Sequence, residues 1–497
     1  MLAWTIYLSF AAAAAMFLIK PDNRQGARML ALGAALAGLA VGLIGSAGRG
    51  GEFAVATRLP WIPTLGAQFL LASDGISRVL VVLTGLAAVA GILFSWNVEH
   101  RTREFFALYL ALIGGVYGVF LSFDLLLLFV FYEIAIVPKY FLIAIWGSAR
   151  REYAAMKLAL YSFAGSAMVL AGLIAAHVES GSHGFDLAEL ARYPFPASFQ
   201  HWAFPLVFVG FAILAGLWPF HTWAPTGHAA APTAASMLLA GVVMKLGAYG
   251  CLRVAMTLFP EGLAAWRHFF GALAVAGIVH GALVALSQRD FKFVVGYSSV
   301  SHMGFVLLGL MTVSTIGLGG AVLQMFSHGI IAGLLFGVVG RMVYDREHTR
   351  DLDELRTRRL GRRMPFAAVT FVVAALASMG IPGFSGFVAE FKVLVGAWQT
   401  FPKLALLAGV GIVLGAAYTL RAVQKVFFDG DPEGSPDGTA GADGTTPSVV
   451  SLPEKIGASL LVAATVAVGL CPKLLLDWIT PSFASPLFDG LRKGGGL

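Results

Sequence analysis

The run from Phe123 to Gly147 is long enough and apolar enough to cross a lipid bilayer as a helix. It nevertheless contains a carboxylate, Glu133, and its other charged residues are Asp124 at its start and Lys139 further along. An ionisable side chain near mid-depth costs at least about 2.5 kcal/mol, so it normally faces protein or water and has a function. A protonated carboxyl group that only hydrogen-bonds to a neighbouring helix is the alternative. The run predicts a membrane protein with a titratable group in its interior.

The composition supports the same class of protein. Of the 497 residues, 58% are hydrophobic and 12% are charged, whereas an average soluble chain has about 25% charged residues. The cysteines, Cys251 and Cys471, both lie in apolar segments, so we expect neither a disulfide framework nor a metal cluster. The formal charge of +7 does not indicate nucleic-acid binding, because the basic residues lie in short loops between apolar runs.

The apolar runs predict an all-α membrane protein with about fourteen spanning helices. These segments begin near positions 2, 28, 76, 104, 123, 154, 204, 229, 268, 293, 316, 365, 403 and 456. The first segment lacks a preceding basic region, so we interpret it as a retained helix and not as a cleaved signal peptide. Loops after odd-numbered segments are rich in Lys and Arg, above all residues 341–363. The positive-inside rule makes these loops cytoplasmic and places both termini on the opposite side.

Two segments are interrupted at membrane depth. Prolines interrupt the stretch from Trp218 to Ser236, and Gly and Pro interrupt the stretch from Gly380 to Phe387. Irregular backbone at that depth is tolerated only inside protein or along a wet cavity. Such breaks in corresponding places of two halves predict an inverted-repeat transporter with its path at the repeat interface. The polar stretch from Asp429 to Pro447 predicts a flexible cytoplasmic loop before the last helix.

Four further ionisable residues lie in predicted spanning helices: Lys245, His302, His328 and Glu390. Lys245 has apolar residues on both sides, which favours an interior position over a snorkelling one. Such a lysine exchanges its proton near neutral pH, because a low dielectric disfavours the ammonium. Histidine is well suited to passing protons, although each histidine here can equally be a packed hydrogen-bonding group.

Three more residues are secondary candidates for the same path. We interpret Lys292 as an interfacial lysine next to Asp290, or as the cytoplasmic end of the path. His221 and His228 bracket the first interrupted segment, where freed backbone groups and water favour proton uptake. No HxxH, HExxH or CxxC spacing indicates a metal site, and no glycine loop indicates a phosphate site.

Several stretches occur in a fixed order along the chain. They read FYEIAIVPKYFLIAIWG, REYAAMKLALYSFAGS, PFHTWAPTGHAAAPTAASMLLAGVVMKLGAYG, DFKFVVGYSSVSHMGF, QMFSHG, HTRDL and GIPGFSGFVAEF. In this order they resemble chain M of respiratory complex I, the antiporter-like membrane subunit of NADH–quinone oxidoreductase. The resemblance covers roughly residues 75 to 430. Subunits of cation/proton antiporters and membrane-bound hydrogenases share the architecture.

The resemblance implies two inverted five-helix repeats, each with a half-channel, joined by a central chain of polar groups. The expected divisions are residues 1–103 (helices 1–3), 104–258 (first repeat), 265–428 (second repeat), 429–455 (loop) and 456–497 (last helix and tail). By resemblance, Glu133 is the helix-five glutamate, Lys245 the central lysine, His328 a relay and Glu390 the helix-twelve glutamate. NADH, FMN, iron–sulfur clusters and quinone are expected in partner subunits and no cofactor in this chain. The expected location is a bacterial-type inner membrane.

The chain departs from the family's pattern at two positions. The family has a lysine seven residues before the histidine of its PxHxW motif, where this chain has Leu214, and an aspartate where it has Thr226. Lys139 is a candidate replacement, although it lies about 9 Å along the helix from Glu133 and about 240° around it. The leading hypothesis is a proton-translocating subunit. The alternatives are a sodium/proton antiporter or hydrogenase subunit, or a scaffold with an impaired first half-channel.

Overall fold

The structure is a computed structural model of residues 1–497, of which it describes all except 49, 182–183, 430–448 and 494–497. In the described residues, 12 helices are long and apolar enough to cross a membrane, and Trp4–Leu18 and Pro365–Ser378 are shorter apolar helices. Together they account for the fourteen predicted segments. The predicted loop from Asp429 to Pro447 lies almost wholly outside the described residues.

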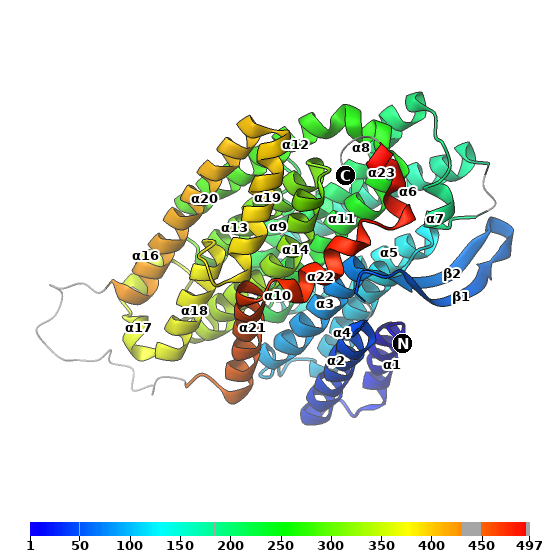
Figure 1. Ribbon diagram of the computed structural model, residues 1–497. Coiled ribbons are helices and arrows are strands. Elements are labelled where there is room, and N and C mark those ends of the chain that lie inside the picture. Colours follow the sequence, from blue (N-terminus) through cyan, green and yellow to red (C-terminus); the bar gives the residue numbers. More distant parts are fainter. Residues whose placement is uncertain (49, 182–183, 430–448, 494–497) are drawn as a thin grey trace, which may run out of the picture.

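The first part of the chain contains three helices and a β-hairpin. They are α1 (Trp4–Ala15), η1 (Met16–Leu18), α2 (Arg24–Ser46), β1 (Ala54–Ile62), η2 (Pro63–Leu65), β2 (Ala67–Ser73) and α3 (Gly75–Phe94). The antiparallel hairpin pairs Ala54 with Ser73 and Ile62 with Ala67, and it projects from the helical body (Figure 1). The sequence reading had not anticipated it.

The middle of the chain forms the next group of helices. They are α4 (Thr102–Leu121), α5 (Leu125–Trp146), α6 (Arg151–Glu179), α7 (Leu187–Leu190), α8 (Ala197–Ala215), α9 (Trp223–Ala230), α10 (Thr233–Leu238), η3 (Leu239–Val243), α11 (Met244–Gly250) and η4 (Cys251–Met256). Elements α10 to η4 form one continuous span in which η3 and η4 are π-helical. The predicted interruption is confirmed, because α8 ends at Ala215 and α9 begins only at Trp223.

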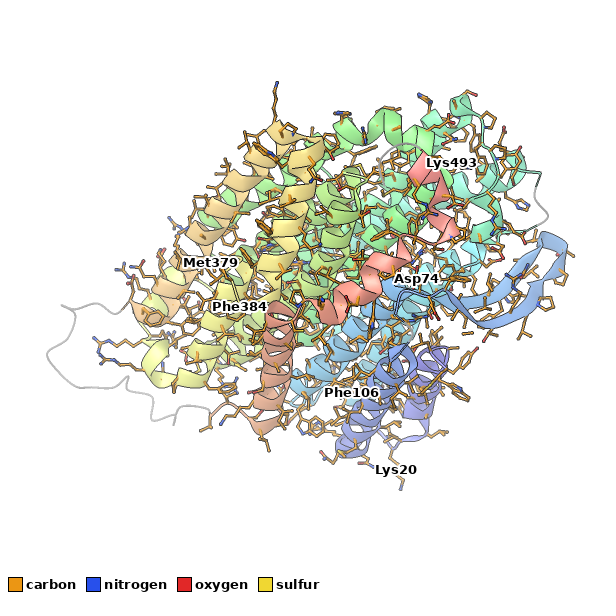
Figure 2. All side chains as sticks on the ribbon, viewed as in Figure 1. Lys20, Asp74, Phe106, Met379, Phe384 and Lys493 are labelled. Carbon is orange, nitrogen blue, oxygen red and sulfur yellow. The ribbon has the colours of Figure 1, made fainter. Side chains whose placement is uncertain are left out.

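The following group contains the second interruption. Its elements are α12 (Pro260–Ser287), α13 (Phe291–Met311), α14 (Thr315–Phe336), η5 (Gly337–Tyr344), α15 (Asp345–Glu347), α16 (Leu352–Arg356), α17 (Leu360–Arg363), α18 (Pro365–Ser378), α19 (Ser385–Thr400), α20 (Pro402–Val423) and η6 (Gln424–Phe428). The break between α18 and α19 is flanked by Met379 and Phe384, which are labelled in Figure 2. Gly380 and Gly383 lie in it with φ of +69° and +100°, a region that glycine adopts without strain.

Equivalent aspartates cap helices at the two ends of the molecule. Asp124 caps α5 by accepting from the N–H groups of Leu126 and Leu127, and its backbone bridges to Asp186, which caps α7. Asp290 caps α13 in the same way, and its backbone bridges to Asp351, which caps α16. Side-chain oxygens satisfy helix N–H groups that have no partner within the helix.

The C-terminal segment lies against the helical body. It consists of α21 (Leu452–Leu470), α22 (Lys473–Ser482), η7 (Pro486–Phe488) and α23 (Asp489–Lys493), and it crosses the view in red in Figure 1, where α22 runs past α3 and α14. Glu454 in α21 is 1% exposed and pairs with Arg341 at 2.6 Å and Arg346 at 2.7 Å. These ion pairs fix the last spanning helix to the segment that follows α14.

A second buried ion pair holds α3 against the end of the span that contains η4. Arg253 in η4 lies 2.7 Å from Asp74, the residue that caps α3, and their side chains are 0% and 2% exposed. The Arg253 guanidinium also lies over the rings of Phe123, Tyr249 and Phe488 at 5.1, 5.2 and 5.6 Å. The C-terminal segment, which supplies Phe488, is therefore part of this packing.

Candidate functional site

Lys245 lies at the centre of the molecule and is completely buried. It stands in α11, a short helix between the π-helical segments η3 and η4. Its Nζ donates to the Ala240 carbonyl and lies 2.8 Å from His328 Nδ1 on α14. Extra residues in a π-helix widen its turns, and such segments are common at functional sites. The fold thus places the predicted central lysine against a backbone carbonyl and an imidazole, and no carboxylate hydrogen-bonds to it within the described residues.

Polar side chains continue the series from His328 to Glu390, although no hydrogen bond joins His328 to His302 among the described residues, where His328 Nε2 has no partner. The rings of His328 and His302 lie 5.5 Å apart between centroids. His302 Nδ1 lies 2.8 Å from Glu390 Oε1, and its Nε2 lies 3.0 Å from Ser378 Oγ. The series Lys245, His328, His302 and Glu390, which we call the central chain, connects residues that are far apart in the sequence.

Four elements bring the central chain together. α11 carries Lys245, α14 carries His328, α13 carries His302, and α19 carries Glu390. Gln324 on α14 also donates to Glu390 Oε1, at 3.1 Å. The break before α19 approaches the carboxylate closely, because a Cβ at Gly380 would lie 3.1 Å from Glu390 Oε2. Lys392 is not a hydrogen-bonding partner of Glu390 in the described structure.

Two secondary candidates lie between the central chain and the loops rich in arginine. His228 in α9 is 0% exposed, and neither of its ring nitrogens has a hydrogen-bond partner among the described residues. Lys292 is 2% exposed and donates to the Ala231 carbonyl at 3.1 Å. Lys292 lies next to Asp290, whose Oδ1 accepts its backbone N–H at 2.9 Å, but its side chain is buried in the protein and does not pair with that carboxylate. Asp290 pairs with Arg350 at 3.1 Å, and Lys292 points inward because α13 buries its first turn.

His221 lies apart from the central chain, in the break between α8 and α9. Its side chain is buried, and its Nδ1 has no hydrogen-bond partner in the described part of the protein. Its ring lies 5.2 Å from that of His280 on α12. The predicted bracketing of the break is therefore only partly right, since His221 lies within it and His228 within α9.

Glu133 and Lys139 form a separate group on α5. Lys139 is 1% exposed and donates to Ser162 Oγ on α6 at 3.3 Å. Glu133 Oε1 is buried, and within the described ranges it has no hydrogen-bond partner and no ion pair with Lys139. Leu214 is buried, and Thr226 accepts a hydrogen bond from Lys157 at 3.4 Å.

Several residues of these groups were missed by the sequence reading. Gln324, Ser378 and Ser162 are polar but uncharged, and such residues are common in spanning helices, so the sequence carried no strong signal for them. Asp74 and Arg253 did carry a signal, because both are charges at or within apolar stretches. Across the described residues, no group of three or more His, Cys, Asp or Glu side chains is arranged to hold a metal ion.

A comparison of the sequence with known protein families identifies the family to which a chain with this central chain of residues belongs. Residues 122–415 match the family described as NADH:quinone oxidoreductase/Mrp antiporter, TM. The chain belongs to this family. The matched region includes all four residues of the central chain as well as Glu133 and Lys139.

Individual family members resemble most of the chain. NAD(P)H-quinone oxidoreductase chain 4 1 from Synechococcus sp. (strain JA-3-3Ab) is 42% identical over 76% of this chain and 73% of its own length. NADH-quinone oxidoreductase subunit M from Rhodobacter capsulatus is 38% identical over 85% of this chain and 82% of its own. A chain of respiratory complex I from Thermus thermophilus superposes with a TM-score of 0.89 at 29% identity, and the match covers 100% of both chains. The resemblance to chain M and the all-α membrane fold are confirmed.

Proposed function

We propose that this chain is a proton-translocating membrane subunit of an NADH–quinone oxidoreductase. The observation that carries the proposal is the central chain, in which Lys245, His328, His302 and Glu390 meet inside the membrane. Buried ionisable groups in membrane proteins mark ion pathways and proton relays. A lysine, two imidazoles and a carboxylate in sequence can each take up and release a proton.

Two half-channels feed the central chain in this proposal. The first lies in residues 104–258 and contains Glu133, and the second lies in residues 265–428 and contains Glu390. The capping aspartates support this division, because Asp124 and Asp290 each cap the second helix of one repeat and bridge to a later capping aspartate. His228 and Lys292 lead from Lys245 toward the loops rich in arginine. His221 lies buried in the first break, where it receives protons that enter along the interrupted backbone.

The arginine-rich loops face the cytoplasm, and both termini lie on the other side of a bacterial-type inner membrane. Other membrane subunits of the complex, including antiporter-like homologues, are the partners. NADH, FMN, iron–sulfur clusters and quinone belong to partner subunits. Their redox reactions supply the driving force, and this chain supplies the proton path.

The test replaces the residue at the middle of the path. Lys245→Ala in the intact complex removes the group that joins the two halves, so proton pumping into membrane vesicles should fall to a small fraction of the wild-type rate. Electron transfer from NADH to an artificial acceptor should remain, because it occurs in other subunits. Lys392→Ala is the matched control, since Lys392 lies outside the central chain. Unchanged pumping by Lys245→Ala would refute the assignment.

A second candidate function is that of a subunit in a multi-subunit sodium/proton antiporter, because the matched family includes Mrp antiporters. Membrane-bound hydrogenase is a further alternative. Purification of the intact complex discriminates between them. Copurification with NADH-oxidising activity supports the proposal, whereas sodium-dependent proton exchange without a redox partner supports the antiporter.

A further inference from the structure

The two charged residues inside α5 do not contact each other. Glu133 and Lys139 are separated by about 9 Å along the helix axis and by about 240° around it. Lys139 is 1% exposed, and its recorded partner is the neutral hydroxyl of Ser162. Glu133 Oε1 is buried without a hydrogen-bond partner among the described residues. Each group therefore lacks a direct counter-charge.

The neighbouring helix α6 supplies one serine to each of these groups. Ser162 accepts from Lys139 at 3.3 Å. Ser166 interacts with the Glu133 carboxylate, and its hydroxyl also donates to the Phe163 carbonyl at 3.2 Å. Both serines are buried, at 2% and 4% exposure. Residues four apart lie on the same face of a helix, about 6 Å apart along its axis.

The order of the groups fits the directions of the two helices. α5 and α6 are consecutive, are joined by a short connection and contact each other. The two helices therefore run in opposite directions. The direction from Lys139 to Glu133 on α5 is the same as the direction from Ser162 to Ser166 on α6. The Ser162 hydroxyl donates to no acceptor in the described part of the chain, so its proton is free to be passed on.

We propose that Ser162 and Ser166 connect Lys139 to Glu133 as one proton-conducting group in the first half of the molecule. The inference rests on the proposed function and deepens it. Lys139 is the donor, the serines are positioning and relaying hydroxyls, and Glu133 is the acceptor.

The transfer step conserves atoms and charge. The Lys139 ammonium gives a proton to Ser162 Oγ as the Ser162 proton leaves for a water molecule between the two serines. The water passes a proton to Ser166, and the Ser166 proton binds Glu133, leaving a neutral amine and a neutral carboxylic acid. A hydroxyl both donates and accepts, and a bridging water is nearly as good a link as a direct hydrogen bond. The reverse transfer restores the ammonium and the carboxylate.

The low dielectric makes this exchange accessible. The Lys139 side chain is buried and the Glu133 side chain is half-buried, and two such separated charges are expensive because neither has a direct ionic partner. Neutralising both by one proton transfer removes that penalty. A lysine that only stabilised packing would need neither the free hydroxyl proton of Ser162 nor a second serine beside the carboxylate.

The experiment uses the intact complex in membrane vesicles. Lys139→Met should abolish most of the proton pumping while NADH oxidation with an artificial acceptor persists. Ser162→Ala should slow pumping about five-fold, the effect of losing one ordinary hydrogen bond, and Ser162→Thr should keep pumping near the wild-type rate because the hydroxyl remains. Ser46→Ala is the control, because its buried hydroxyl donates only within α2, to Gly42 at 2.7 Å.

The double variant Lys139→Met/Ser162→Ala should be no slower than Lys139→Met alone, since residues in one path are not additive. Normal pumping by Lys139→Met and Ser162→Ala, with loss in Lys245→Ala, would overturn this inference and leave the proposed function intact. Equal loss in Ser162→Ala and Ser162→Thr would also overturn it, because packing and not the hydroxyl would then be responsible.

Discussion

At the scale of single residues, the central chain contains one carboxyl group, that of Glu390. Glu390 accepts hydrogen bonds from Gln324 at 3.1 Å and interacts with His302 at 2.8 Å. Among the described residues, Lys245 hydrogen-bonds to the Ala240 carbonyl and to His328 and to no carboxylate. Along the central chain, a proton that leaves Lys245 therefore reaches the Glu390 carboxylate through His328 and His302.

Glu390→Gln tests this dependence. The amide has nearly the same shape and still hydrogen-bonds to His302 and Gln324, but it cannot bind and release a proton. We expect most of the pumping to be lost with little change in stability. Dye-monitored acidification of vesicles measures the pumping, and thermal unfolding of the purified complex measures the stability. A variant that pumps normally would remove Glu390 from the path.

At the scale of secondary structure elements, charged pairs fix the helices that carry the path. Arg253 lies in the same continuous span as Lys245 and pairs with Asp74 at the start of α3. Figure 2 labels Asp74 beside the C-terminal segment, whose Phe488 packs on the Arg253 guanidinium. The pair therefore holds three elements together at one end of the span.

Arg253→Met should destabilise the protein by about 3–5 kcal/mol, because it leaves the buried Asp74 carboxylate without its partner. The double variant Arg253→Met/Asp74→Leu should recover much of that loss, since no unpaired charge remains. Denaturation of the complex in detergent measures both. A double variant that is less stable than Arg253→Met would show that the pair itself, and not the orphaned charge, governs stability.

The sequence predicted these elements to different extents. The lengths of the apolar runs predicted the spans. Prolines and glycines predicted both breaks, because these residues act locally on the backbone. The hairpin was missed because the apolar residues of β1 and β2 belong to a stretch between two spans. The pairing of Lys245 with His328 was not predictable from spacing, since 83 residues separate them. They come together because α14 packs against α10 and η3, which belong to the same continuous span as α11.

At the scale of the whole molecule, the two halves are chemically unequal. The second half has a histidine beside its glutamate, whereas the first has Lys139 and two serines, with Leu214 buried on α8. The family has a lysine at the position where this chain has Leu214, and Leu214 is a buried apolar side chain. In the described part of the first half, the fully buried lysines are therefore Lys139 on α5 and the central Lys245 on α11.

Leu214→Lys distinguishes an impaired first half from a rearranged one. If Lys139 already conducts protons, a second buried lysine nearby adds an unpaired charge, and pumping should fall with loss of stability. A gain in pumping would instead indicate that the first half is impaired in this chain. Proton-to-electron ratios in vesicles decide between the two, and Leu214→Met controls for the change in side-chain shape.

The placement of the central chain has an electrical consequence. Lys245, His302 and His328 each lie near the middle of a spanning element, so a proton moving among them travels within the membrane plane. Such lateral movement does almost no work against the transmembrane voltage. Raising a charge from one face to mid-depth takes about half of the full crossing, or ~1.2 kcal/mol per 100 mV. The transmembrane voltage therefore opposes the uptake and the release of protons at the two membrane faces. It leaves the transfer of protons between the two halves of the molecule unaffected.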